Sequence, residues 1–193
     1  MKKLTFVGSG VETEKYKNGI PEIDSVVKLI SKYYTDVLYG GTNAGLMGKF
    51  SESAKRHKLK VTSVVPKWFA EKHKELISQG DKLILTENLA ERKKILEDTD
   101  TMLCYPGGVG TLDELFNIIA RISLGEMKPV PVIIYNFERF YSPMILQLEF
   151  GVKTGAIRKD VMDFIYTFES NEYNGRTSLQ LNLKDVKPAG SPD

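Results

Sequence analysis

The chain has 193 residues, of which 41% are hydrophobic and 27% charged, and its formal net charge at pH 7 is +2. This length suffices for one sizeable core but is short for two full domains. A charge so close to zero argues against nucleic acid or a membrane surface as a partner.

A single cysteine, Cys104, excludes a disulfide within the chain, and its place in an apolar run indicates a buried thiol in a reducing compartment. The first residues lack the apolar core of a secretion signal. No apolar run reaches the roughly 18 residues that a membrane-spanning helix needs. We therefore expect a cytoplasmic protein.

Short apolar runs alternate along the chain with segments of helical spacing. The predicted strands, in chain order, are 3–7, 36–39, 60–65, 82–86, 101–105, 130–135 and 164–168. The helices predicted between them are 21–33, 44–57, 88–98, 110–124 and 141–150, with an irregular or partly helical stretch over 67–80. The helix over 110–124 has the clearest apolar stripe, formed by Leu112, Leu115, Phe116, Ile119 and Ile122.

This alternation predicts parallel βαβ units. We expect an α/β fold with a single Rossmann-like, doubly wound, mostly parallel sheet and helices on both faces. The expected domain covers residues 1–170, and a polar tail covers 171–193, with its last residues from Lys187 disordered. In such folds ligands bind outside the carboxyl ends of the strands, so the loops at that edge are the place to look for chemistry.

The strongest motif is Pro106-Gly107-Gly108-Val109-Gly110-Thr111, which leaves a predicted strand and enters a predicted helix. Glycines permit positive φ and let the backbone approach a ligand closely, and the amides at a helix N-terminus favour an anion such as phosphate. The motif is neither a Walker loop nor a GxGxxG fingerprint, so NAD is disfavoured. A simpler interpretation is that Thr111 and Glu114 form only a capping box.

Two further loops fall at the same edge. The segment from Tyr39 to Gly48 is rich in glycine, which fits either ligand contact or a tight turn with close packing. Asn88 and Glu91 have the spacing of a helix cap, and Arg92 follows one turn later. An arginine suits oxyanions, although an Arg-Lys pair alone more often lies on a solvated face.

These motifs together resemble the LOG ("Lonely Guy") family of cytokinin riboside 5′-monophosphate phosphoribohydrolases, long mislabelled lysine decarboxylases. The resemblance rests on Pro106-Gly107-Gly108-x-Gly110-Thr111-x-x-Glu114, on Arg92-Lys93 and on Gly40-Gly41-x-x-x-Gly45-Leu46-Met47-Gly48. The family's glycine triplet is here Gly40-Gly41-Thr42, and Leu89-Ala90-Glu91 stands where Met-His-Glu is usual. These departures concern the pocket for the base.

The resemblance implies a Rossmann-like homodimer that releases an adenine-type base and ribose 5-phosphate. Arg92 and Glu114 would be the catalytic pair. The residues expected to bind substrate are Gly41, Arg92, Lys93, Gly107, Gly108, Val109, Gly110, Thr111, Leu112, Asp113 and Glu114. Cleavage of an N-glycosidic bond builds positive charge on the ribose, which a carboxylate such as Glu114 would stabilise.

Alternatives stay open at this point. The chain could be a non-catalytic carrier of a nucleotide or phosphorylated cofactor, or a nucleosidase that accepts AMP or GMP. The decarboxylase label would need a pyridoxal phosphate lysine, and nothing in the sequence singles one out. No spacing of histidine, cysteine and carboxylate residues matches a metal site, so we expect neither metal nor cofactor.

Overall fold

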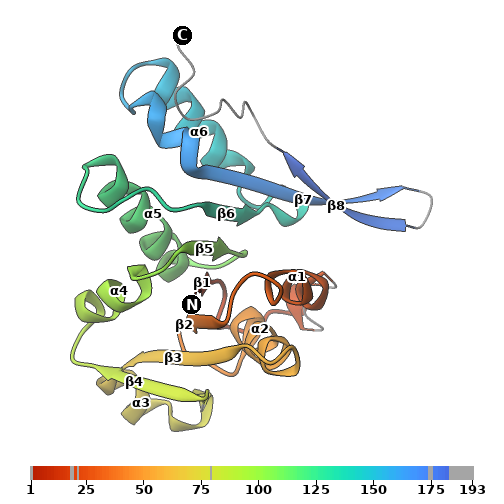
Figure 1. The fold of residues 1–193 in the computed structure, drawn as a ribbon, viewed down its shortest axis with the longest axis vertical. Coiled ribbons are helices and arrows are strands. Elements are labelled where there is room, and N and C mark those ends of the chain that lie inside the picture. Colours follow the sequence, from red (N-terminus) through yellow and green to blue (C-terminus); the bar gives the residue numbers. More distant parts are fainter. Residues whose placement is uncertain (1, 18–19, 21, 79, 174–175, 183–193) are drawn as a thin grey trace.

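The computed structural model describes residues 2–182 except 18–19, 21, 79 and 174–175. Its strands form one eight-stranded sheet in the order β4-β3-β2-β1-β5-β6-β7-β8 (Figure 1). The strands are β1 (Lys3–Val7), β2 (Asp36–Tyr39), β3 (Lys60–Pro66), β4 (Lys82–Thr86), β5 (Thr101–Cys104), β6 (Val132–Tyr135), β7 (Ile165–Tyr173) and β8 (Arg176–Asn182). Neighbouring strands from β4 to β7 are parallel, and β8 pairs antiparallel with β7. The expected doubly wound, mostly parallel sheet is confirmed.

Helices cover both faces of the sheet. They are α1 (Ile23–Ile30), α2 (Gly45–Arg56), α3 (Lys67–Lys72), α4 (Leu89–Glu97), α5 (Val109–Ser123) and α6 (Ser142–Lys153). Alternate residues of a strand point to opposite faces. Accordingly Phe6 packs with α1 and α2, whereas its neighbour Val7 packs with α5 and α6. None of the described helices is both long and apolar enough to span a membrane.

The chain reverses its winding beside β1. From β1 the chain winds through α1 and α2 to β2 and β3, and then returns through α4 to β5 on the other side of β1. Loops after β1 and β5 therefore leave the same edge in different directions. Such a switch point is where doubly wound sheets form their ligand crevice.

The structure corrects the predicted apolar stripe of α5. Leu115, Ile119 and Ile122 are buried as expected, and so is Ile118. Phe116, placed in the stripe by its spacing, is instead 41% exposed. The buried stripe is narrower than the spacing suggests because α5 packs on the sheet and α6 only along one side.

The end of the chain carries more strand than the sequence indicated. Strand β7 continues to Tyr173, and β8 occupies Arg176–Asn182, within the segment assigned to a polar tail. Leu179 and Leu181 alternate there with polar residues, a period-two pattern that the polar composition obscured. The domain boundary at residue 170 stays a prediction, and the disorder expected from Lys187 onward lies outside the described residues.

Candidate functional site

The loop after β1 and the glycine loop after β5 are joined by backbone hydrogen bonds. The amide of Tyr105 donates to the Val7 carbonyl at 2.8 Å, and the amide of Ser9 donates to the Pro106 carbonyl at 3.0 Å. The Ser9 carbonyl accepts from Met47 at 3.0 Å, which attaches the start of α2 to the same place. Gly8 and Ser9 thus belong to this site, although they are not among the predicted site residues. The Gly8-Ser9-Gly10 run directly after β1 was the available signal.

The start of α5 has the form of an anion site rather than a capping box. Its N-cap is Gly108, and no side chain caps the helix, so Thr111 and Glu114 do not play the capping roles that their spacing suggested. The first amides of a helix have no partner within the helix. Without a side-chain cap, the amides that open α5 are available to a ligand, and the helix dipole favours a negative one.

The three glycines of this loop serve different purposes. None has a positive φ, so the expected conformational reason does not apply here. A Cβ on Gly107 would overlap the Thr111 side chain and approach the Gly8 backbone to 3.0 Å, so Gly107 is needed for packing. A Cβ on Gly108 or Gly110 would meet nothing within 4 Å among the described residues. Packing within the protein does not require those two glycines, which fits a surface left bare for a ligand.

The catalytic pair predicted from the sequence is an ion pair in the structure. Asn88 caps α4 by accepting the Glu91 amide at 2.9 Å, which sets Arg92 in the first turn. The Arg92 guanidinium donates through Nε to the Val64 carbonyl at 3.0 Å and through Nη1 to Glu114 Oε1. Their side chains are 12% and 6% exposed. Two helices and a strand end therefore hold both groups in place.

Burial raises the pKa of the Glu114 carboxyl above its ordinary value of 4.5, and the charge of Arg92 opposes that rise. Lys93, which is paired with Asp113 at 3.1 Å, opposes it more weakly. A buried carboxyl beside a fixed cation is an arrangement typical of acid–base chemistry.

The second glycine loop contributes to the site through Gly40, which the sequence did not single out. A Cβ on Gly40 would come within 2.6 Å of Arg92 Nη2, so this glycine makes room for the guanidinium. Gly41 is buried with a φ of +83°, and a Cβ there would overlap Val65 of β3. Glycine is therefore needed at position 41 for the positive φ of the turn and for close packing against β3. The sequence could not distinguish the two because adjacent residues at a strand end face opposite sides.

Other predicted residues differ in their surroundings. Val109 is 83% exposed at the start of α5, and Leu112 packs against the core between α5 and α6. Cys104 is buried, and burial raises the pKa of its thiol to about 12, as befits a core residue. His57, at the end of α2, lies 3.3 Å from Asp24 of α1.

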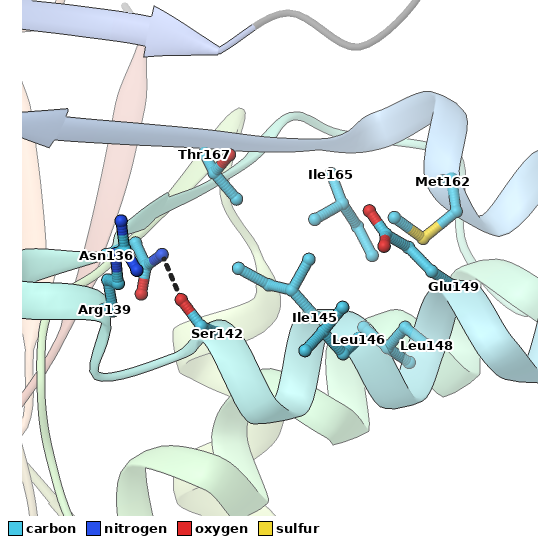
Figure 2. Close-up of a pocket in the computed structure, with 10 residues that line it drawn as sticks. All are labelled: Asn136, Arg139, Ser142, Ile145, Leu146, Leu148, Glu149, Met162, Ile165 and Thr167. Carbon is cyan, nitrogen blue, oxygen red and sulfur yellow. Dashed lines mark hydrogen bonds between the residues drawn. The ribbon is translucent and has the colours of Figure 1, made fainter.

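The structure also contains a cavity of about 360 Å³ that the sequence did not indicate. It lies between α6 and β7, and Ile145, Ile165 and Met162 form part of its wall (Figure 2). Asn136 and Ser142 lie at one end of it, and Glu149 lies at the other. None of the lining residues belongs to the predicted site.

Comparisons with known proteins identify related sequences. The family model described as "possible lysine decarboxylase" matches residues 47–174. A cytokinin riboside 5′-monophosphate phosphoribohydrolase from Mycobacterium marinum is 37% identical over 129 residues, which cover 66% of this chain and 67% of that protein. A probable enzyme of the same name from Oryza sativa is 28% identical over 67% of this chain. The match spans only 53% of the rice protein's length.

Among solved structures, the molybdenum cofactor binding protein from Rippkaea orientalis is similar with a TM-score of 0.56. The two are 20% identical, and the match covers 86% of each chain. At that identity the likeness concerns the fold alone. The family match includes both members of the Arg92–Glu114 pair and the glycine loop after β5, and the chain therefore belongs to the LOG family, whose model carries the older decarboxylase description.

Proposed function

We propose that the protein hydrolyses the N-glycosidic bond of a nucleoside 5′-monophosphate to give free base and ribose 5-phosphate. The observation that carries this proposal is the buried Arg92–Glu114 pair beside the uncapped start of α5. A protein that only bound a phosphate would need the second feature but not the first. Curated relatives named as phosphoribohydrolases support the same reaction.

In the proposed reaction the phosphate binds at the bare loop, where Gly108 and Gly110 leave the backbone accessible. Its binding energy holds the ribose against Glu114. The water oxygen bonds to the anomeric carbon as the bond from that carbon to the base nitrogen breaks. The ionised Glu114 stabilises the developing positive charge and accepts one proton from the water, while the other hydrogen stays on the new ribose hydroxyl. The proton held by Glu114 then passes to the nitrogen of the departing base, which restores the carboxylate.

Arg92 has two parts in this scheme. Its charge favours the ionised form of Glu114, and its contact with the Val64 carbonyl fixes where that carboxylate lies. A guanidinium also suits the phosphate oxygens or the negative charge that moves to the leaving base. We assign the remaining predicted substrate contacts to Gly41, Lys93, Val109, Thr111, Leu112 and Asp113.

The direct test is release of product by the purified protein. It would be incubated with AMP, GMP and N6-isopentenyl-AMP, and free base and ribose 5-phosphate would be quantified by chromatography. We expect base release that disappears in Glu114→Gln, and the ranking of the three substrates gives the specificity. Calorimetric binding of a monophosphate without base release would instead favour the non-catalytic carrier.

We also propose a homodimer. The apolar stretch 118–124, whose composition fits either an interface or the core, is largely core, since Ile118, Ile119 and Ile122 are buried. The exposed apolar residues nearer the site are Val109 and Phe116, seven residues apart and hence on one face of α5. Light scattering after size-exclusion chromatography should give twice the chain mass for the wild type and a lower mass for Phe116→Glu.

A further inference from the structure

The glycine loop is held on its two sides by different means. On the β1 side, backbone hydrogen bonds continue past the strand to Pro106. On the β6 side, the ladder ends at the pair Cys104–Ile134. The chain after β6 turns toward β7 instead, and the Asn136 amide donates to the Phe168 carbonyl at 2.9 Å. Among the described residues, the Tyr105 carbonyl, which opens the loop, accepts no backbone hydrogen bond.

A tyrosine side chain takes the place of that missing partner. The Tyr141 hydroxyl donates to the Tyr105 carbonyl at 2.8 Å, and the Cys104 thiol donates to the same hydroxyl at 3.3 Å. Tyr141 is 1% exposed, and its ring packs with Cys104 and Leu115 in the core between α5 and α6. Burial raises the pKa of this hydroxyl far above its ordinary value, so it keeps its proton and remains a donor.

The position of Tyr141 is itself fixed by a buried asparagine. Asn136, which is 3% exposed, accepts the Tyr141 amide through Oδ1 at 2.7 Å and donates through Nδ2 to Ser142 Oγ at 3.1 Å (Figure 2). The end of β6 thus sets where α6 begins. Because the Tyr141 backbone is held in this way, its rigid ring places the hydroxyl at the Tyr105 carbonyl.

We propose that Tyr141 is a positioning residue for phosphate binding, whose hydroxyl holds the Tyr105 carbonyl and so aligns the backbone amides that follow it. Its effect on turnover rests on the proposed function, but its effect on phosphate affinity does not. Amides that must converge on one anion lose affinity when the strand end that carries them can shift. The hydroxyl touches no substrate, so its removal should weaken binding more than it slows the chemical step.

The test compares two variants that each delete one tyrosine hydroxyl bonded to the same stretch of chain. Tyr141→Phe removes the bond at the carboxyl end of β5. Tyr34→Phe removes the bond between Tyr34 Oη and Thr101 Oγ1, which is 2.7 Å long and lies at the amino end of β5. Tyr141→Phe should lower the thermal midpoint more than Tyr34→Phe does, since its hydroxyl bonds both the Tyr105 carbonyl and the Cys104 thiol, whereas the Tyr34 hydroxyl bonds Thr101. Tyr34→Phe therefore controls for the loss of a tyrosine hydroxyl bonded to β5, and the two variants are compared by ligand affinity.

Only Tyr141→Phe should change the ligand site. We expect its affinity for ribose 5-phosphate, measured by calorimetry, to fall about tenfold, the equilibrium effect of roughly one lost hydrogen bond. With a nucleoside monophosphate, KM should rise by a similar factor while kcat changes less than about threefold. Tyr34→Phe should leave the affinity and KM within about twofold of the wild type, because its hydroxyl lies at the opposite edge of the sheet.

Equal affinities in the two variants would overturn the proposal and leave Tyr141 with a structural role alone. Asn136→Ala, which keeps the hydroxyl but frees the amide that positions it, gives a second reading should Tyr141→Phe not fold. Its affinity should fall by a smaller factor, and an unchanged affinity in folded Asn136→Ala would also overturn the proposal. Wild-type protein that binds ribose 5-phosphate but releases no base would overturn the proposed function only, since the affinity comparison still decides the role of Tyr141.

Discussion

Three ion pairs join helices α4 and α5 in the described part of the chain, and the two that contain a buried carboxylate differ. At the edge that carries the glycine loops, Arg92 of α4 meets Glu114 of α5. Toward the other end, Glu97 of α4 meets Arg121 of α5. The two carboxylates are equally buried, each in a residue that is 6% exposed.

The difference is in how well each carboxylate is satisfied. Glu97 accepts hydrogen bonds from the side chains of Asn117 and Arg121, and Arg121 has a further partner in Glu126. Among the described residues, Glu114 accepts a side-chain hydrogen bond from Arg92 alone. A well-satisfied buried carboxylate stabilises a fold, whereas one with fewer partners is costly to ionise and remains chemically available. We infer that the Glu97 pair joins the helices and that the Glu114 pair is kept for chemistry.

The largest expected effect is on turnover. Glu114→Gln should lower kcat by about 10²- to 10⁴-fold, the usual contribution of a positioned acid–base group. Glu97→Gln, the matched change at the other pair, should leave kcat within about threefold of the wild type because it lies away from the loops. Steady-state assays of both variants measure this. Similar losses in the two variants would remove the distinction between the pairs.

The free energy of unfolding should be lowered more by Glu97→Gln than by Glu114→Gln, the reverse of their order in turnover. Glu97→Gln should lower the free energy of unfolding by about 2 kcal/mol, as expected when a buried charge-assisted hydrogen bond is lost. Glu114→Gln should cost little or even stabilise the protein near neutral pH. Burial raises the pKa of Glu114 in the folded state, so the folded state binds this proton more tightly than the unfolded state does, and ionisation at higher pH costs stability. Urea denaturation at pH 7 measures both values.

That stability difference should also depend on pH with a defined sign. Relative to the wild type, Glu114→Gln should gain stability as the pH rises above about 4.5, where the unfolded carboxyl ionises first. Below that pH both states of the wild type are protonated and the gain should vanish. A gain that instead grew on acidification would contradict the raised pKa.

The pH dependence of turnover tests the role of Arg92. If Glu114 works as a carboxylate, kcat/KM should fall on acidification with a midpoint above the ordinary pKa of 4.5, because burial raises the pKa. Arg92→Ala removes the nearby charge that opposes this rise, so the midpoint should move to still higher pH. Arg121→Ala should leave it unchanged. A midpoint that stayed in place in Arg92→Ala would show that another group titrates.

The sequence predicted well those features that depend on local residue patterns, namely the strands, the fold class and the cap of α4. Apolar alternation located each strand from β1 to β6 at a residue range close to the observed one and found the start of β7, and the fold class followed from their order. Asn88 capped α4 as its spacing indicated. Arg92 and Glu114, 22 residues apart in sequence, were paired only through the family resemblance, and the structure brings them into contact.

The sequence could not predict the contacts that depend on how separate elements are arranged in space. It could not show that Gly40 rather than Gly41 borders Arg92, since the choice depends on the facing of one strand end. It gave no reason to connect Tyr141 with the loop after Tyr105, because the contact spans 36 residues and two different elements. The alternative interpretation of Thr111 and Glu114 as a capping box was wrong because Thr-x-x-Glu also occurs inside a helix that begins at glycine.

The smallest expected effect is a shift in the acidic midpoint of kcat/KM, and it distinguishes the buried charge of Arg92 from the more exposed charge of Lys93. Lys93 lowers the pKa of Glu114 less than Arg92 does, and its partner Asp113 is half exposed. Lys93→Ala should therefore move the acidic midpoint of kcat/KM upward by less than Arg92→Ala does. Because the Debye length falls from about 10 Å at 0.1 M salt to about 3 Å at 1 M, high salt should erase the Lys93 shift. The Arg92 shift should persist, since its guanidinium and the carboxylate are in contact and screened far less. A salt-sensitive Arg92 shift would mean that water and ions reach the Arg92–Glu114 pair freely. Burial would then not explain why this pair is kept for chemistry while the Arg121–Glu97 pair joins the helices.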